Sequence, residues 1–449
     1  MRKYVLSIVA FMVFFPVFLM AQEENKYKEA NYKEENVPAY ELPDLLTTFS
    51  GKKITSVRQW EQIRRPEIMK FFAENMYGKV PTPQYPVKKE FKVVKEDSTC
   101  LEGLCTRKEI MVRFSNEKGC VEMPMIMFVP NEKKGPCPAI YWMQIDDLEK
   151  GKFELEGPQR FGMTRNGAPL KQMMLRGIAL VSLNCASLAD GSKRLDDHLS
   201  GEIFDLFFHD GQTAPKDDEW GMIGAWAYAM TSGMDYLVKD PDINSRQVAV
   251  MGCSIGAKVA IWAAALDPRI GMVLSATAGH GGDSLWRRQF GETLANMCEW
   301  LPRWICVNAQ KYASDITSMP VDQHMLLACL APRPFYVSNG IYDYWADNKG
   351  EWLATYHAVP VYQLYGKKNP FGSERQPEVN KPVLKSSVGY HVRTGSHGLK
   401  LYDWERYMEF IEYHFMNKNI RKAHDVYYPN GILMNHYPNQ KGKRYLVIN

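Results

Sequence analysis

The pentapeptide Gly252-Cys253-Ser254-Ile255-Gly256 has the residue types that can expose a serine as a nucleophile. It follows an apolar run at 247–251 and precedes a stretch of helical character at 257–265. The glycines let the backbone turn sharply between a strand and a helix, so the serine hydroxyl stands at the tip of the turn. We predict that Ser254 is a nucleophile; the alternative is a serine that serves only the turn.

A nucleophilic serine needs a base, and the base needs a third group that orients it. The chain order serine, acid, histidine is that of the α/β-hydrolases, where the acid and the histidine follow later strands. Asp343 lies just after the predicted strand 334–338, and Asp347 is a reserve candidate in the same loop. His397 follows the last predicted strand in a glycine-flanked loop. We predict Asp343 as acid and His397 as base; the alternatives are a solvated loop acid and a surface histidine.

Acyl transfer also requires backbone N–H donors that stabilise the negative oxygen of the tetrahedral intermediate. One donor should be the N–H of Ile255, directly after the nucleophile. The other should come from the loop after the strand that ends at Ile145, near Asp146.

Strands and helices alternate over most of the chain. An antiparallel start is predicted within 88–130, and helices are predicted at 57–77 and 221–237. The later predicted strands are 138–145, 177–183, 247–251, 271–276, 334–338 and 388–393. This alternation favours an α/β-hydrolase fold, with a mainly parallel central sheet and helices on both faces, a three-layer αβα sandwich. Ligands of such sheets bind beyond the carboxyl ends of the strands.

The two ends of the chain differ in composition from its centre. Arg2 and Lys3 precede an apolar run that ends at Ala21, which predicts a signal peptide at 1–21, cleaved near Ala21, and a secreted or periplasmic protein. The alternative, a membrane anchor, needs a longer run. We divide the remainder into a polar arm at 22–48, one catalytic domain at 49–418, and a C-terminal extension at 419–449.

The net charge and the apolar runs give no sign of a nucleic-acid or membrane partner, and the cysteine spacing gives no sign of a zinc site. The formal net charge of +4 falls to +2 without Arg2 and Lys3, so nothing indicates nucleic acid, and no other run is long enough for stable membrane insertion. The nine cysteines leave at least one thiol unpaired, and a Cys100–Cys105 disulfide is possible after export. No cysteine spacing resembles a zinc site, and no cofactor is signalled or needed.

Longer runs outside the pentapeptide form a more specific pattern. They lie at 64–68, 77–78, 220–221, 225–226, 235–237, 240–241, 264–269, 279–282, 320–328, 331–334, 345–347, 389–391 and 402–404. With these runs, most of residues 60–410 resembles the glucuronoyl esterases, carbohydrate esterase family 15, which cleave esters between lignin alcohols and the glucuronate side groups of xylan.

The resemblance implies roles for individual residues. Ser254 matches the family nucleophile and His397 its base, while Lys258 matches a lysine that contacts sugar hydroxyls. Positions 254 and 258 lie on one helix face, so the ammonium group can stay near the serine. The other sugar-binding candidates are Trp345, which could cover the glucuronate ring, and, more weakly, Glu292 and Gln310. The alternatives are a solvated helix lysine and a core tryptophan.

The chain departs from the family at three positions. Ile255 stands where the family usually has an arginine that helps to stabilise the oxyanion, and loss of one such donor can cost on the order of 100- to 1,000-fold in rate. Arg287 or Arg288 could supply that charge from another loop. Thr277 stands where many members have a glutamate acid, and Gly398 where fungal members have the cysteine that pairs with the equivalent of Cys253.

These observations favour a serine carboxylester hydrolase that acts on esters of (4-O-methyl-)glucuronic acid in glucuronoxylan–lignin linkages through an acyl-enzyme. Ile255 motivates an alternative, an acetyl esterase of the same fold acting on xylan. A third hypothesis is a catalytically weak polysaccharide-binding protein. The expected partner is a polysaccharide in each case. A peptidase would share the fold, but the chain has no peptidase family run.

Overall fold

The computed structural model of this chain describes residues 30–144, 168–185, 188 and 203–419. The predicted signal peptide at 1–21, the second oxyanion donor near Asp146, and all but the first residue of the C-terminal extension lie outside these residues. Within them, no helix has both the length and the apolar character that a membrane crossing requires.

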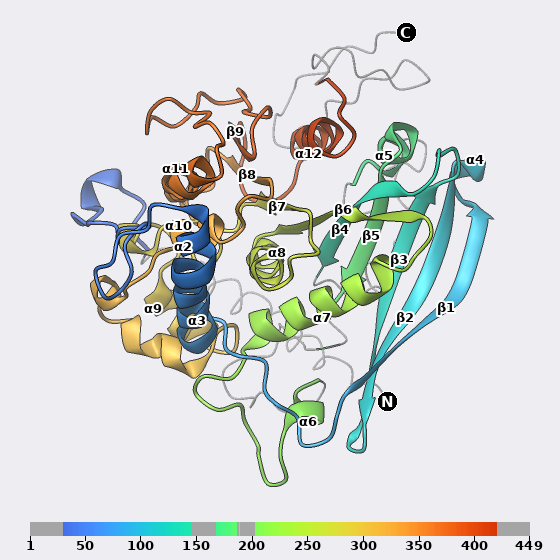
Figure 1. Ribbon diagram of the computed structural model, residues 1–449, viewed down its shortest axis with the longest axis horizontal. Coiled ribbons are helices and arrows are strands. Elements are labelled where there is room, and N and C mark those ends of the chain that lie inside the picture. Colours follow the sequence, from blue (N-terminus) through green and yellow to red (C-terminus); the bar gives the residue numbers. More distant parts are fainter. Residues whose placement is uncertain (1–29, 145–167, 186–187, 189–202, 420–449) are drawn as a thin grey trace, which may run out of the picture.

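The described residues form a sheet of nine strands in the order β1-β2-β3-β5-β4-β6-β7-β8-β9 (Figure 1). The three N-terminal strands form an antiparallel meander, and β3 also pairs antiparallel with β5. The remaining neighbours, from β5 to β9, are parallel. The strands are β1 (Lys88–Thr99), β2 (Cys105–Asn116), β3 (Gly119–Pro130), β4 (Cys137–Gln144), β5 (Ala179–Asn184), β6 (Ile243–Cys253), β7 (Met272–Ala276), β8 (Phe335–Gly340) and β9 (Val388–Arg393).

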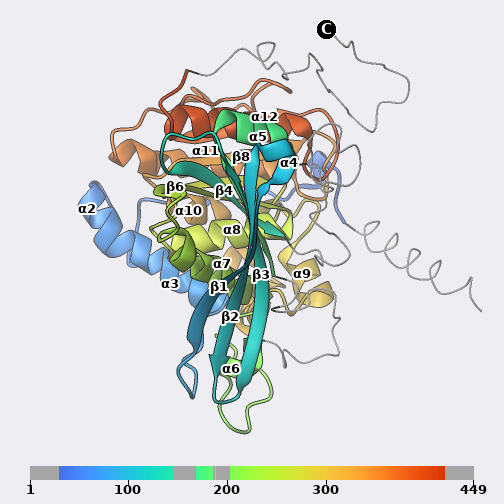
Figure 2. The same cartoon turned by 90° about the vertical axis from the view of Figure 1, so that its right-hand side faces the viewer.

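Helices cover both faces of this sheet, and each face has its own apolar core. Alternation along β6 illustrates the division, because Val248 and Val250 join one core while Ala249 and Met251 join the other. The first core is covered mainly by α3 (Arg65–Asn75), α7 (Met222–Leu237), α8 (Ile255–Leu266), α10 (Gln323–Ala328) and α11 (Asn348–Leu364). The second is covered by α5 (Leu170–Arg176) and α12 (Leu401–His414), as Figure 2 shows from the side. The predicted α/β-hydrolase fold, with its antiparallel start, is confirmed.

Shorter helices complete the connections. They are η1 (Glu34–Asn36), α2 (Val57–Gln59), α4 (Cys100–Gly103), α6 (Ile203–Phe207), η4 (Trp286–Arg288), α9 (Leu294–Trp300), η5 (Val307–Tyr312) and η6 (Ile316–Ser318). The helix predicted at 57–77 is not uniform, because the π-helical segment η2 (Trp60–Arg64) separates α2 from α3. Arg64 in that segment is buried and donates to the carbonyl oxygens of Asp44 and Leu45, a contact that periodicity could not indicate.

All nine cysteines lie in the described residues and are free thiols. Cys100 and Cys105 face each other across an isolated antiparallel bridge, and the Cys105 thiol donates to the Cys100 carbonyl oxygen at 3.7 Å. The disulfide considered possible for this pair is not formed in the structure.

The fit between α7 and the sheet depends on Gly233. A Cβ atom on this residue would lie 1.9 Å from the hydroxyl oxygen of Tyr141 on β4. Gly233→Ala should therefore lower the free energy of unfolding by about 1 to 3 kcal/mol through overpacking. Urea denaturation would measure the change, with Thr231→Ala on the half-buried side of the same helix as control. Equal stability of the two variants would contradict this account of the packing.

Candidate active site

Ser254 occupies a strained turn between β6 and α8. Its φ of 55° and ψ of −124° lie in a region that side-chain-bearing residues rarely adopt, and its N–H donates to the Ala276 carbonyl oxygen at 2.9 Å. Gly252 makes the turn possible, because a Cβ atom there would lie 2.0 Å from the backbone of Gly256. Ile255 is the first residue of α8, so its N–H has no acceptor inside the helix and can face an oxyanion.

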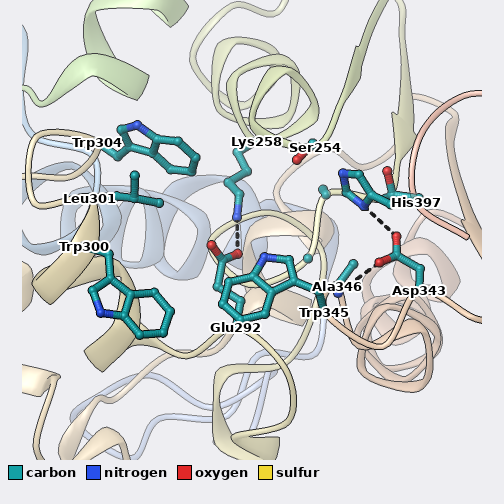
Figure 3. Close-up of a pocket in the computed structure, with 13 residues that line it drawn as sticks. Ser254, Lys258, Glu292, Trp300, Leu301, Trp304, Asp343, Trp345, Ala346 and His397 are labelled. Carbon is teal, nitrogen blue, oxygen red and sulfur yellow. Dashed lines mark hydrogen bonds and ion pairs between the residues drawn. The ribbon is translucent and has the colours of Figure 1, made fainter. Parts of the chain in front are cut away.

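His397 and Asp343 form a hydrogen-bonded pair beside this turn. His397 Nδ1 lies 2.7 Å from Asp343 Oδ2, and the side chains are 43% and 2% exposed, respectively. Asp343 Oδ1 also accepts from the Ala346 N–H at 3.3 Å, which fixes the carboxylate. Figure 3 shows the imidazole between Asp343 and Ser254. The structure has no direct hydrogen bond between Ser254 and His397, a contact that often tightens only when substrate binds.

Asp347, the reserve acid, serves another purpose. Its Oδ1 accepts from the Gly350 N–H at 3.0 Å and caps α11, and its Oδ2 binds Arg288 Nε at 2.8 Å. Of the two aspartates in this loop, Asp343 is therefore the one that can orient His397.

The three residues open onto a cavity of about 480 Å³. Its described lining also includes Lys258, Glu292 and Trp345, three of the predicted sugar-binding residues. The fourth, Gln310, is exposed in η5 and does not line the cavity, so its assignment is not supported. Trp300, Leu301 and Trp304 line the cavity instead, and sequence reasoning did not identify them.

Lys258 and Glu292 form a buried ion pair in the floor of the cavity (Figure 3). Lys258 Nζ lies 2.6 Å from Glu292 Oε2, and it also donates to the carbonyl oxygen of His280. The side chains are only 2% and 5% exposed. Because removing one partner would leave the other charge buried and unpaired, the pair is a fixed polar feature that can offer a donor and an acceptor to hydroxyl groups.

The arginine missing at position 255 is not replaced by the arginines considered for this role. Arg287 binds Asp322 at 3.1 Å, and Arg288 binds both Asp347 and Glu34. Neither lines the cavity. Among the described lining residues, Lys258 is the only lysine or arginine.

Thr277 and Cys253 lie close to the nucleophile, and neither has a carboxylate that could orient the base. The Thr277 hydroxyl is 3.5 Å from the Cys253 thiol, and the Thr277 N–H donates to the Ser338 carbonyl oxygen at 2.8 Å. Thr277 lines the cavity next to Ser254. A threonine cannot replace a carboxylate as the partner of the base, which leaves that role to Asp343.

A buried arginine holds the loop that carries His397. The Arg393 guanidinium donates to the carbonyl oxygens of Ser396 (3.2 Å) and Gly398, one on each side of His397. The same group is anchored by both oxygens of Asp403, at 2.9 and 2.8 Å from Nε. The histidine position thus depends on one guanidinium group, whose Nε binds Asp403 while its two terminal nitrogens donate to the loop.

His391 completes this support from β9. Its Nε2 lies 2.8 Å from Asp403 Oδ1, and its Nδ1 lies 2.9 Å from the Tyr336 hydroxyl. Burial lowers the pKa of His391 below its ordinary value, which favours a neutral ring that donates to Asp403 and accepts from Tyr336. Although burial alone would raise it, the His391 hydrogen bond and the Arg393 charge hold the pKa of Asp403 below its ordinary value.

Arg393→Lys should lower kcat by about 10- to 100-fold with little change in KM. A lysine keeps the charge but cannot donate as a fork, so the His397 loop would shift slightly from its reactive position. Steady-state kinetics on any ester that the protein cleaves would measure both constants, with exposed Arg375→Lys as control. A change in KM alone, or no change in either constant, would contradict a positioning role.

Two buried carboxyl groups lie behind the cavity wall. Glu351 Oε1 accepts from the N–H of Gly279, a lining residue, at 2.8 Å, and Asp283 Oδ2 accepts from the Ser275 hydroxyl at 2.5 Å. Burial raises the pKa of Asp283 to about 6, although hydrogen bonds from Ser275 and Glu351 act to lower it. Burial and the neighbouring carboxylates of Asp283 and Asp343 raise the pKa of Glu351 well above its ordinary value. The pair therefore retains a proton at pH values where isolated carboxyl groups would be ionised.

These raised pKa values predict a pH-dependent stability. The folded state binds protons more tightly than the unfolded state, so the stabilisation is full below pH about 4, and the part due to Asp283 is lost as pH rises through about 6. Glu351→Gln keeps the acceptor for Gly279 and removes one acid, so it should reduce this loss between pH 4 and 7 by about 1 to 3 kcal/mol. Urea denaturation at several pH values would test this, with exposed Glu299→Gln as control. An unchanged pH dependence in Glu351→Gln would refute it.

The described part of the N-terminal arm supports the same cavity. Glu34 binds Arg288 Nη2 at 2.8 Å and also binds Lys349, and the Gly291 N–H donates to the Asn31 carbonyl oxygen at 2.8 Å. The Arg288 hydrogen bond lowers the pKa of Glu34 to about 2. The arm thus packs against the loop that leads into Glu292, whose own N–H donates to the Trp345 carbonyl oxygen at 2.9 Å.

Within the described ranges, no group of three or more histidine, cysteine, aspartate or glutamate residues is arranged to hold a metal ion. What the described arrangement offers is a strained serine, a histidine–carboxylate pair and a polar floor, which together suit acyl transfer from an ester with hydroxyl groups nearby.

Comparisons with known proteins place this geometry in context. A family model described as "Glucuronyl esterase, fungi" matches residues 113–366. The chain is 32% identical to carbohydrate esterase MZ0003, from an unknown prokaryotic organism, over 86% of this chain and 92% of that protein. Its fold is similar to the glucuronoyl esterase from Solibacter usitatus, with a TM-score of 0.76 and 32% identity over 85% of this chain and 100% of the other. A promiscuous CE15 esterase from a marine bacterial metagenome gives a TM-score of 0.75 at 32% identity, covering 86% and 100% of the two chains.

Proposed function

The chain belongs to the glucuronoyl esterases of carbohydrate esterase family 15, and from this membership we propose that it hydrolyses esters of (4-O-methyl-)glucuronic acid in glucuronoxylan–lignin linkages. The observation that carries the proposal is the buried Lys258–Glu292 pair in the floor of the cavity that holds Ser254 and His397. An ion pair at this position can bind the hydroxyl groups of a uronate whose ester carbonyl meets the serine.

The proposed reaction proceeds through an acyl-enzyme. The Ser254 hydroxyl attacks the ester carbonyl, and His397 Nε2 takes its proton while Asp343 holds Nδ1–H at 2.7 Å. The tetrahedral oxygen faces the N–H of Ile255 at the start of α8. The alcohol leaves with the proton from His397, and a water molecule activated by the same histidine then releases the uronic acid.

Ile255 favours a second candidate, an acetyl esterase that acts on xylan. The Ile255 side chain is apolar and buried, and no described lysine or arginine replaces the family arginine near the nucleophile. An acetyl group has no hydroxyl groups of its own, however, so in this candidate the Lys258–Glu292 pair would bind the xylose on the alcohol side of the ester.

We also propose that the protein acts outside the cytoplasm. The sequence of residues 1–21 supports export. A polymeric substrate would also be encountered outside the cytoplasm.

Ser254→Ala should abolish hydrolysis of benzyl glucuronate, with a loss of at least about 1,000-fold in kcat, because the proposed acyl-enzyme forms on the Ser254 hydroxyl. Hydrolysis of the ester and release of acetate from acetylated xylan would be measured side by side, with exposed Ser373→Ala as control.

Three outcomes distinguish the candidates. Serine-dependent cleavage of the glucuronate ester would support the main proposal, and serine-dependent release of acetate alone would support the second candidate. If neither substrate is hydrolysed and the affinity for glucuronoxylan does not depend on the serine, both esterase candidates are contradicted and a polysaccharide-binding protein is indicated.

A further inference from the structure

The two edges of the central sheet are protected differently. At the β9 edge, the Val383 N–H donates to the Tyr390 carbonyl oxygen at 2.9 Å, and the Asn380 N–H donates to the Val392 carbonyl oxygen at 2.8 Å. No described segment pairs with the outer edge of β1, which is the outermost strand in Figures 1 and 2. Ten of the twelve β1 residues are exposed. This edge therefore presents backbone N–H and C=O groups with which another strand can pair.

β1 has two features that keep an open edge from pairing with arbitrary strands. The first is its charge, because four of its residues are lysines: Lys88, Lys89, Lys92 and Lys95. The second is a bulge, since the register with β2 shifts between Val93 and Lys95. At the same time the centre of the strand exposes apolar surface, with Val93 42% and Val94 50% exposed. A partner strand that covers this centre must match both the charges and the bulge.

A second copy of β1 matches the charges. When the strand is set antiparallel to itself about a point between residues 92 and 93, every charged residue but Lys92 meets one of opposite sign. The pairs are Lys88 with Asp97, Lys89 with Glu96, and Glu90 with Lys95, and two-fold symmetry forms each pair twice. Each register one or two residues away places at least one pair of like charges opposite each other, which is unfavourable. The charges of β1 therefore select one register of self-pairing.

The bulge brings the members of each pair to the same face of the sheet. Lys89 and Glu96 lie opposite Phe114 and Lys108 of β2, which are both buried. The other four residues lie opposite odd-numbered residues of β2, which point to the other face: Lys88, Glu90, Lys95 and Asp97 are opposite Ser115, Arg113, Glu109 and Arg107. Without the bulge, an even-numbered and an odd-numbered residue would point to opposite faces. Residues that meet in the self-paired register thus share a face, as cross-strand contacts require.

We propose that the outer edge of β1 is a self-association surface, on which a second copy of this chain pairs antiparallel and continues the sheet across two subunits. Both copies use the same strand, so the contact closes as a two-fold dimer. β1 contributes no described residue to the cavity lining, so association leaves both cavities open. One pair of strands buries less area than a typical stable interface, and the dimer should therefore form only at protein concentrations of about 1 to 100 µM.

Sedimentation velocity at low ionic strength would test this over the same concentration range. The mean mass of the wild-type protein should rise with concentration from one subunit towards two. Glu90→Lys or Lys95→Glu alone should raise the dimer Kd about ten- to hundredfold, because each places like charges opposite each other twice. The double variant Glu90→Lys with Lys95→Glu restores opposite charges and should return the Kd to within about threefold of wild type. Exposed Lys385→Glu, just before β9, makes the same charge change away from β1 and is the control.

The double variant separates pairing between copies from damage within one chain. Both substitutions also act on β2, since Glu90 lies opposite Arg113 and Lys95 Nζ lies 4.0 Å from Glu109 Oε1. Damage to the β1–β2 contact would accumulate in the double variant, whereas self-pairing would recover. The proposal is overturned if wild-type protein remains monomeric over the whole range, if the single variants associate as wild type does, or if the double variant associates no better than the single variants. None of these outcomes depends on the esterase activity.

Discussion

Parallel pairing of β6, β7, β8 and β9 is the constraint on which the site depends. In register, Gly252 pairs with Ser275 across β6 and β7, and Ser338 pairs with His391 across β8 and β9. Because parallel strands end at the same edge, the loops that follow them bring Ser254, Asp343 and His397 together although more than a hundred residues separate the first from the last. The antiparallel strands β1 to β3 extend the sheet on one side and contribute no described residue to the cavity lining.

Buried charge pairs fix the positions of the loops that the parallel strands bring together. Arg393 and Asp403 hold the His397 loop from below, Arg288 joins Asp347 to Glu34 in the N-terminal arm, and the Lys258–Glu292 pair forms the cavity floor. Desolvation makes such pairs weak sources of net stability, but breaking one leaves an isolated buried charge. These ion pairs therefore fix the positions of segments more than they add to the free energy of unfolding. Each one holds a segment that the sheet itself does not position.

The same geometry explains how the site can be complete without the family arginine. The Ile255 side chain is buried and apolar and cannot supply the charge of an arginine, yet the Ile255 N–H remains at the start of α8. Backbone donors at a helix start depend on the turn and not on the side chain, so the elbow keeps one oxyanion contact with any residue at this position. What the substitution removes is a basic side chain, and among the described lining residues Lys258, already paired with Glu292, is the only lysine or arginine.

The sequence by itself determined the fold class, the order of the strands along the chain and the three residues that meet at the cavity. These features follow from local patterns: apolar runs that mark strands, glycines that allow the turn at Ser254, and loops that must follow β8 and β9. Tertiary structure alone decided which side chains complete the cavity. Gln310 is a residue type that can bind sugars, but it is exposed and does not line the cavity. Trp300, the last residue of α9, does line it. Arg287 and Arg288 form ion pairs with Asp322 and Asp347, which lie far from them in the sequence. The physical reason is that the direction of a loop side chain depends on contacts between segments far apart in the chain, which no local periodicity encodes.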